Sequence, residues 1–187
     1  METTLISCSN CSNKLNMSSL DYPTLSVSRL STPSAFVVWC VQYWCRLTKN
    51  NIDPSAGIKE AFDKANINSS CSDVSSEFDN IMKYISVSSR QDFSEIYGTC
   101  HNIGNLEKIF LIVLSLEQNN KGHLSSRVLN SYLPLSSSRI IGSKFYYLSR
   151  ALTRVKLYIN LEPELIDTMA IFLTRNNPSM QNNRTLN

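Results

Sequence analysis

The chain has 187 residues, of which 42% are hydrophobic and 18% are charged, and its formal net charge is +3. This length allows one domain with a sizeable core, and the hydrophobic content excludes a chain that is disordered throughout. Glycine occurs five times, where average usage would give roughly thirteen. Because tight turns and phosphate-binding loops depend on glycine, its scarcity argues against nucleotide-binding α/β folds and many-turned β-sandwiches.

Signals for export or membrane insertion are absent from the sequence. The first 30 residues lack a basic segment followed by an unbroken apolar core, which is typical of a secretory signal. The most apolar runs, residues 35–41 and 109–114, are much shorter than the ~20 residues that span a bilayer. We therefore expect no membrane span and an intracellular (cytoplasmic) protein, or one inside a viral particle, that is not secreted. Its six cysteines are expected to be reduced thiols.

The two ends of the chain differ in composition from the middle. Residues 1–31 are rich in Ser, Thr and Asn, and their isolated leucines follow no sustained period. We expect this segment to be a flexible polar arm. Residues 176–187 are similarly polar and are expected to form a flexible tail. Residues 32–175 form the predicted single helical domain.

Two Xaa-Pro pairs mark helix starts in the first half of this domain. Thr32-Pro33 combines an N-cap residue with a first-turn proline and predicts a largely apolar, buried helix over 32–47. Asp53-Pro54 repeats the signal, and the apolar residues from 58 to 65 then recur at i, i+3, i+4 and i+7. A third amphipathic stripe is predicted over 74–85.

The second half of the domain contains further helical segments. A short helix is expected over 90–97, where Gly98 would end it. The apolar run 106–116 fits either a buried helix or a buried strand, and the helix-forming residues at its flanks favour the helix. Two more helices are predicted over 125–133 and 166–173.

The longest predicted helix follows Ser138 and reaches about residue 159. Its apolar residues are alternately four and three positions apart, which is typical of a seam that packs against one partner surface. The seam consists of Ile141, Phe145, Leu148, Leu152, Val155 and Ile159. Together these patterns predict an all-α fold, a helical bundle of about five to seven helices with flexible polar N- and C-terminal arms.

Positive charge is concentrated in one part of the chain. Residues 1–120 carry nine Lys or Arg and twelve Asp or Glu, a net charge of −3. Residues 121–160 carry seven basic residues and no acidic one, a net charge of +7. The remaining residues carry two basic and three acidic side chains. The modest overall charge therefore hides a basic block.

Helix geometry places much of this basic block opposite the apolar seam. At about 100° per residue, arginines and tyrosines share the outward face, with Lys144 at its flank. Arginine pairs with phosphate oxygens in a forked geometry, and aromatic rings stack with unpaired bases. The predicted nucleic-acid-binding residues are Arg139, Lys144, Tyr146, Tyr147, Arg150 and Arg154. The alternatives are that this face is solvated, that it docks on an acidic surface of the same protein with the tyrosines half-buried between helices, or that it contacts an anionic membrane surface.

Candidate metal and catalytic residues do not form a convincing pattern. Cys8 and Cys11 form a C-x-x-C pair, but zinc modules add a second pair at a compact distance. Cys100 and His101 are instead adjacent and far along the chain. Neither His101 nor His123 lies in a local pattern with a nucleophile, and glycine-rich phosphate-binding motifs are absent. We expect no metal, no cofactor and no enzymatic activity.

Two short strings resemble the front part of rod-forming tobamovirus coat proteins. They are Thr32-Pro33-Ser34 with Phe36-Val37, and Phe93-Ser94-Glu95. Together they cover fewer than ten residues. The resemblance implies a four-helix coat subunit that winds around RNA, and the function expected from the charge pattern does not depend on it.

The helix faces and the basic block predict a non-enzymatic structural protein that self-associates and contacts RNA, of the viral coat or nucleocapsid type. Its partners would be copies of itself and RNA. The alternative is a small helical adaptor or host-modulating protein that binds a helix of another protein in a groove of the bundle.

Overall fold

The computed structural model describes residues 25–68, 73–88 and 102–175, which contain seven α-helices and no strand. A short 3-10 turn, η1 (Val27–Arg29), comes first. The helices are α1 (Thr32–Lys49), α2 (Ser55–Lys64), α3 (Val74–Ser88), α5 (Asn105–Gln118), α6 (Gly122–Tyr132), α7 (Leu135–Arg154) and α8 (Pro163–Arg175). The predicted all-α bundle is thus confirmed. The predicted helix over 90–97, the predicted tail and residues 1–24 of the predicted arm lie outside the described residues.

The first two helices begin at the predicted signals. The Ser31 hydroxyl accepts the Ser34 N–H at 3.4 Å, so the N-cap of α1 is one residue earlier than expected, with Pro33 in the first turn. At the start of α2 the Asp53 carboxylate accepts the Ser55 N–H at 3.1 Å. Each of these bonds satisfies a backbone donor that the first helical turn leaves unpaired.

The last part of the predicted arm is folded. Leu25 is fully buried, and its carbonyl accepts the N–H of Ile103 at 3.1 Å. Arg29 forms an ion pair with Glu164 at the start of α8. Residues 25–31 therefore belong to the helical body, and the predicted boundary at residue 31 is too late. Leu25 belongs to no run of apolar residues with a helical period, so the sequence pattern did not predict that it is buried.

In four helices the second residue after the helix has a positive φ, and none of these residues is glycine. They are Asn51, Asn66, Asn120 and Lys156, with φ between 55° and 61°. At the end of α5 the N–H of Lys121 donates to the carbonyl of Leu116 at 2.8 Å, which is the Schellman pattern. Asparagine tolerates the left-handed conformation better than most residues. It therefore supplies three of the four left-handed helix ends, a position that glycine usually occupies.

The longest helix begins and ends several residues earlier than predicted. α7 ends at Arg154, because the left-handed Lys156 turns the chain and the Leu157 N–H donates to the Leu152 carbonyl at 2.9 Å. Ile159 nevertheless stays buried. Gln118 at the end of α5 holds this segment, because its side-chain oxygen accepts the Ile159 N–H at 2.8 Å. The seam thus continues in space after the helix has ended.

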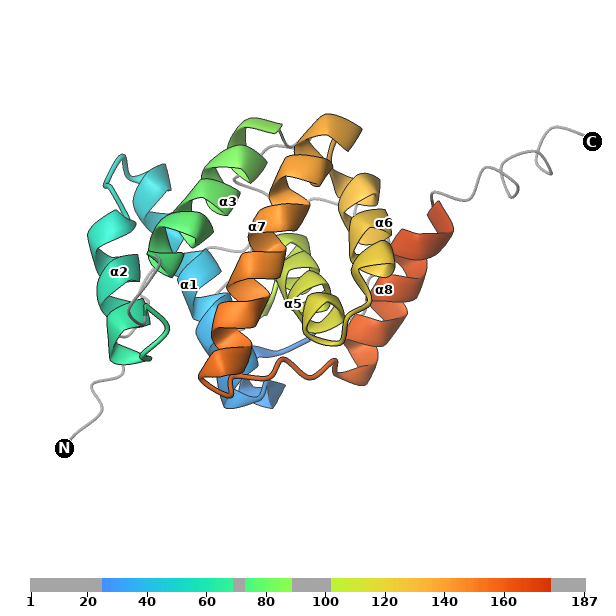
Figure 1. Cartoon of the computed structure of the whole chain (residues 1–187), viewed down its shortest axis with the longest axis horizontal. Helices are drawn as coiled ribbons and strands as arrows, with labels where there is room; N and C mark the ends of the chain where they lie inside the picture. Colours follow the sequence, from blue (N-terminus) through green and yellow to red (C-terminus); the bar gives the residue numbers. More distant parts are fainter. Residues whose placement is uncertain (1–24, 69–72, 89–101, 176–187) are drawn as a thin grey trace, which may run out of the picture.

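Helix α5 lies at the centre of the bundle. It packs against α1, α6, α7 and α8, and every residue from 106 to 117 is buried. Burial on all sides explains the unbroken apolar run, and the ambiguous segment is a helix as expected. α7 packs against α5, α3 and α6, and in Figure 1 it lies in front of α5, between α3 and α6. Among the described helices none is long and apolar enough to cross a membrane.

A row of phenylalanine rings connects five of the helices. Neighbouring rings have centroids between 4.9 and 5.8 Å apart, within the range of favourable tilted and edge-to-face contacts. In order, the row contains Phe36 of α1, Phe62 of α2, Phe78 of α3, Phe110 of α5 and Phe145 of α7. This row fixes α7 to the core through the side opposite its charged face.

Candidate nucleic-acid interface

Helix α7 has one buried face and, opposite it, one polar face. The seam residues that lie within the helix are buried, Leu148 among them. Ser138 and Ser149 are also buried, but each hydroxyl donates to a carbonyl of the preceding turn, at 3.1 Å and 2.7 Å respectively. These bonds remove the cost of burying a hydroxyl. The seam can therefore be tightly packed while the opposite face remains in water.

Four of the six predicted binding residues are exposed on this opposite face. They are Arg139, Tyr146, Tyr147 and Arg154. Tyr146 is 45% exposed and Tyr147 is 66% exposed, which is unusual for such large rings. The two rings meet edge to face with centroids 5.9 Å apart. Rings that lie this far out of the core present stacking surfaces to solvent.

Arg150 occupies the middle of the face and is partly buried. Its guanidinium carbon lies 5.0 Å from the centroid of the Tyr146 ring, a cation–π contact. One of its terminal nitrogens, Nη2, donates to the side-chain oxygen of Asn120, in the turn between α5 and α6. Its Nε is buried and has no hydrogen-bond partner. Arg150 is thus held in place by neutral groups that do not cancel its charge.

Lys144 does not belong to the exposed face. Its ammonium group lies 2.7 Å from a carboxylate oxygen of Glu77 on α3, and its side chain is only 21% exposed. The prediction that it binds nucleic acid is therefore not supported. Lys144 instead follows the alternative given above, in which a basic residue of α7 pairs with an acidic side chain of the same protein. The sequence could not show this, because Glu77 is 67 residues away.

Further basic side chains lie near the C-terminal end of α7. Lys121 and Lys156 are exposed and belong, with Asn120, to turns that follow α5 and α7. Gln118 ties these turns together, since its amide nitrogen donates to the carbonyl of Leu157 at 2.8 Å. Within the described part of the chain, the ion pairs involve none of the three arginines of the α7 face. The face therefore presents positive charge without an internal counter-charge.

Large apolar side chains are exposed along the packed pair of helices α3 and α7. Ser88 and Ser137 meet at one end of the helix pair and Glu77 and Lys144 at the other, so the two helices are antiparallel. Tyr84 lies one turn before Ser88, and Ile140 lies one turn after Ser137, so both fall between these contacts. We name Tyr84, Val87 and Ile140 the α3–α7 patch. Their side chains are 41%, 86% and 46% exposed.

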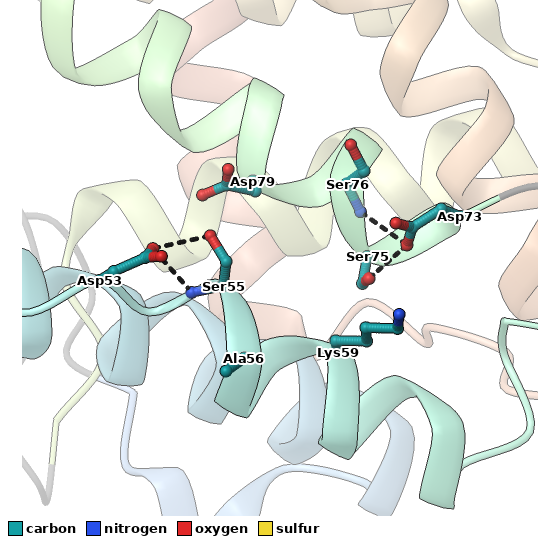
Figure 2. A pocket seen from close by; sticks show the side chains of 8 residues that line it. All are labelled: Asp53, Ser55, Ala56, Lys59, Asp73, Ser75, Ser76 and Asp79. Carbon is teal, nitrogen blue, oxygen red and sulfur yellow. Dashed lines mark hydrogen bonds between the residues drawn. The ribbon is translucent and has the colours of Figure 1, made fainter.

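A polar pocket of about 380 Å³ lies between the starts of α2 and α3 (Figure 2). Three aspartates line it, and each already has partners. Asp53 accepts hydrogen bonds from the N–H and hydroxyl of Ser55, and Asp73 from the Ser75 hydroxyl and the Ser76 N–H. Asp79 accepts the indole N–H of Trp44 at 2.8 Å.

These bonds explain the acidic residues of the pocket as helix caps and as one buried acceptor. The hydroxyl of Ser55 is the main cause that lowers the pKa of Asp53, and the hydroxyl of Ser75 does the same for Asp73. A carboxylate with a lowered pKa remains charged and suits the positive end of a helix. The pocket therefore does not need a catalytic explanation.

Two of the six cysteines lie in the described residues. Cys40 and Cys45 of α1 are buried free thiols, and burial raises the pKa of both. Such thiols pack as small apolar side chains and do not react readily. The described residues contain no group of three or more side chains that could hold a metal ion. Cys8, Cys11 and the Cys100-His101 pair lie outside the described residues.

Comparisons of the chain with protein families, with curated proteins and with solved structures give no match. The resemblance to tobamovirus coat proteins gains no support from them. The described residues contain seven α-helices, whereas the resemblance implied a four-helix subunit. Phe93-Ser94-Glu95, the second of the two strings, lies outside the described residues.

Proposed function

We propose that this protein is a non-enzymatic, self-associating structural protein that contacts RNA through the outer face of α7. The observation that carries the proposal is that the exposed Tyr146, Tyr147, Arg139 and Arg154 share one face of α7 with the partly buried Arg150. A coat or nucleocapsid subunit is the type of protein in which such a face and self-association would act together.

The charge of the α7 face suits a polyanion. Its arginines have no carboxylate partner among the described residues, and residues 121–160 contain no acidic side chain. Binding to phosphates releases condensed counterions, which favours association and makes it depend on salt. The tyrosines add a contact that depends less on salt, because any unpaired base can stack on an aromatic ring.

Self-association draws support from the α3–α7 patch. Large apolar side chains exposed side by side commonly mark protein contacts, and Val87 is 86% exposed. If copies of the chain meet through this patch, then Val87→Asp would lower the assembly size. Sedimentation of the wild type and of this variant, with and without RNA, measures that effect. A wild-type chain that stays monomeric at every concentration would remove the self-association part of the proposal.

RNA binding is tested by fluorescence anisotropy with a labelled, unstructured RNA at several salt concentrations. Arg154→Ala removes one exposed cation without opening a cavity in the core. We expect weaker binding and a slope of log affinity against log salt that is smaller by roughly 0.7. We expect Tyr147→Ala to cost roughly 1–3 kcal/mol of affinity with little change in that slope.

Stability measurements provide the control for these variants. Exposed substitutions usually change the free energy of unfolding by no more than about 0.5 kcal/mol, so both variants should unfold like the wild type. Binding that is unaffected by Arg154→Ala and Tyr147→Ala together would remove the α7 face as the RNA contact.

The α3–α7 patch also favours a second function. A helical adaptor would use such a patch for a helix of another protein, and that contact would persist in high salt. Salt dependence thus separates the two functions, since RNA binding weakens steeply as salt rises.

A further inference from the structure

The side chain of Asn120 joins the turn after α5 to the outer face of α7. The backbone of Asn120 has φ 57° and completes the Schellman end of α5, and its own N–H donates to the Glu117 carbonyl at 3.1 Å. This cap fixes the direction in which the side chain leaves the turn. The side-chain oxygen then accepts a hydrogen bond from Nη2 of Arg150.

Two neutral groups therefore hold the Arg150 guanidinium from different sides. Asn120 binds one terminal nitrogen, and the Tyr146 ring contacts the guanidinium with 5.0 Å between its carbon and the ring centroid. A long arginine side chain loses much rotamer freedom when it binds a ligand. Here much of that freedom is already lost in the free protein, so less of it opposes binding. The amide oxygen of Asn120 holds the guanidinium in place and leaves its charge uncompensated. An aspartate at this position would hold the guanidinium but neutralise its charge.

Arg150 and the two tyrosines together have the features of a small binding site for unpaired nucleotides. The guanidinium has five N–H donors, and in the described residues only the one bond to Asn120 is formed. Tyr147 meets the Tyr146 ring edge to face and is 66% exposed, so ring surface remains in solvent on which a base could stack. A duplex buries its base faces in its own stack, so it could use the charges but not the rings.

We propose that Asn120 is a positioning residue that presets Arg150 over Tyr146, and that the resulting Asn120–Arg150–Tyr146 unit makes the α7 face select single-stranded over duplex RNA. This inference rests on the proposed RNA contact and adds the class of RNA and a residue that sequence analysis did not identify.

The closing experiment uses two substitutions of Asn120 in the full chain. Asn120→Gly keeps the left-handed helix end, which glycine favours, but frees Arg150. We expect the affinity for an unstructured twelve-nucleotide RNA to fall about three- to tenfold, with an unchanged salt slope because no charge is lost. The affinity for a duplex of the same length should fall less, because a duplex uses the charge of Arg150 but not the arrangement of Arg150 over the Tyr146 ring. Asn120→Asp keeps Arg150 in place but neutralises it, so the single-strand salt slope should fall by about 0.7.

Asn66→Gly is the matched control. Asn66 ends α2 with φ 55° and thus makes the same kind of helix end, away from the α7 face. This variant should bind both RNAs like the wild type. Thermal unfolding of all three variants shows whether the helix ends remain intact.

The outcomes separate this inference from the proposed function. Normal binding by Asn120→Gly, together with loss of binding by Arg150→Ala, would overturn the positioning role and leave the RNA contact intact. Equal wild-type affinity for single strands and duplexes would overturn the selectivity. A wild-type protein that binds neither RNA in a salt-dependent way would overturn the proposed function itself.

Discussion

The outer face of α7 and the pocket between α2 and α3 are both polar, but they use their charges differently. In the pocket, the carboxylates of Asp53 and Asp73 cap the helices that they precede, and Asp79 accepts a buried indole N–H. On α7, Arg139 and Arg154 are exposed and take part in none of the ion pairs of the described residues.

The difference shows that the number of charges in a region says little about function. Charges that complete helix ends or satisfy buried donors already contribute to folding. Charges that the fold leaves without a partner are available to another molecule. By this criterion the three aspartates of the pocket are structural, and the α7 face is the better candidate for binding. The following substitutions test this division.

Leu148→Ala should have the largest effect. The side chain lies on the buried face of α7, next in sequence to the exposed Tyr147. Its truncation leaves a cavity and should lower the free energy of unfolding by roughly 2–5 kcal/mol. Tyr147→Ala, one residue away, should leave stability nearly unchanged. Chemical denaturation of both variants measures this contrast, and equal losses would mean that α7 does not have two distinct faces.

Asp79→Ala should have the next largest effect. The substitution removes the acceptor of the buried Trp44 indole N–H and of the Lys83 ammonium group, which lies 2.6 Å from the carboxylate. A buried donor without its acceptor costs about 1–3 kcal/mol. Asp79→Asn keeps an oxygen for the indole and should lose less stability. RNA binding should be unchanged in both variants, because the pocket is not part of the proposed interface.

Lys144→Met should have a smaller effect. Its partner Glu77 is 35% exposed, so the ion pair is partly screened and worth about 0.2–1 kcal/mol. Because Lys144 is already paired with Glu77, we expect RNA affinity to remain close to that of the wild type. A loss of affinity as large as that of Arg154→Ala would show that Lys144 leaves Glu77 to bind RNA.

Acid titration should show the smallest effect, and of the two regions compared only the pocket should contribute to it. The pKa of Asp73 is lowered from its ordinary value of 3.8, chiefly by the Ser75 hydroxyl. The stability that this carboxylate contributes is therefore complete above about pH 3.8 and is lost as the pH falls through the lower pKa of the folded state. Asp73→Asn keeps a capping oxygen but does not titrate. Unfolding measured between about pH 2 and 5 should show a shallower loss for this variant.

Much of the fold was predictable because its signals are local. The helical period of apolar residues, the proline near the start of α1 and the unbroken apolar run of α5 each act within a few turns of chain. The buried and exposed faces of α7 were predictable for the same reason. The scarcity of glycine was a weaker guide, since Asn51, Asn66 and Asn120 took the left-handed helix ends that glycine usually occupies.

The sequence by itself determined the all-helical character of the described residues, the seam of α7 and the concentration of arginines and tyrosines opposite that seam. Only the tertiary structure decided which charges are available. It paired Lys144 with Glu77, held Arg150 with Asn120 and placed Leu25 in the core. The physical reason is that periodicity depends on neighbours along one helix. A salt bridge or a side-chain hydrogen bond depends instead on which helices pack together, at distances of 67 and 30 residues along the chain.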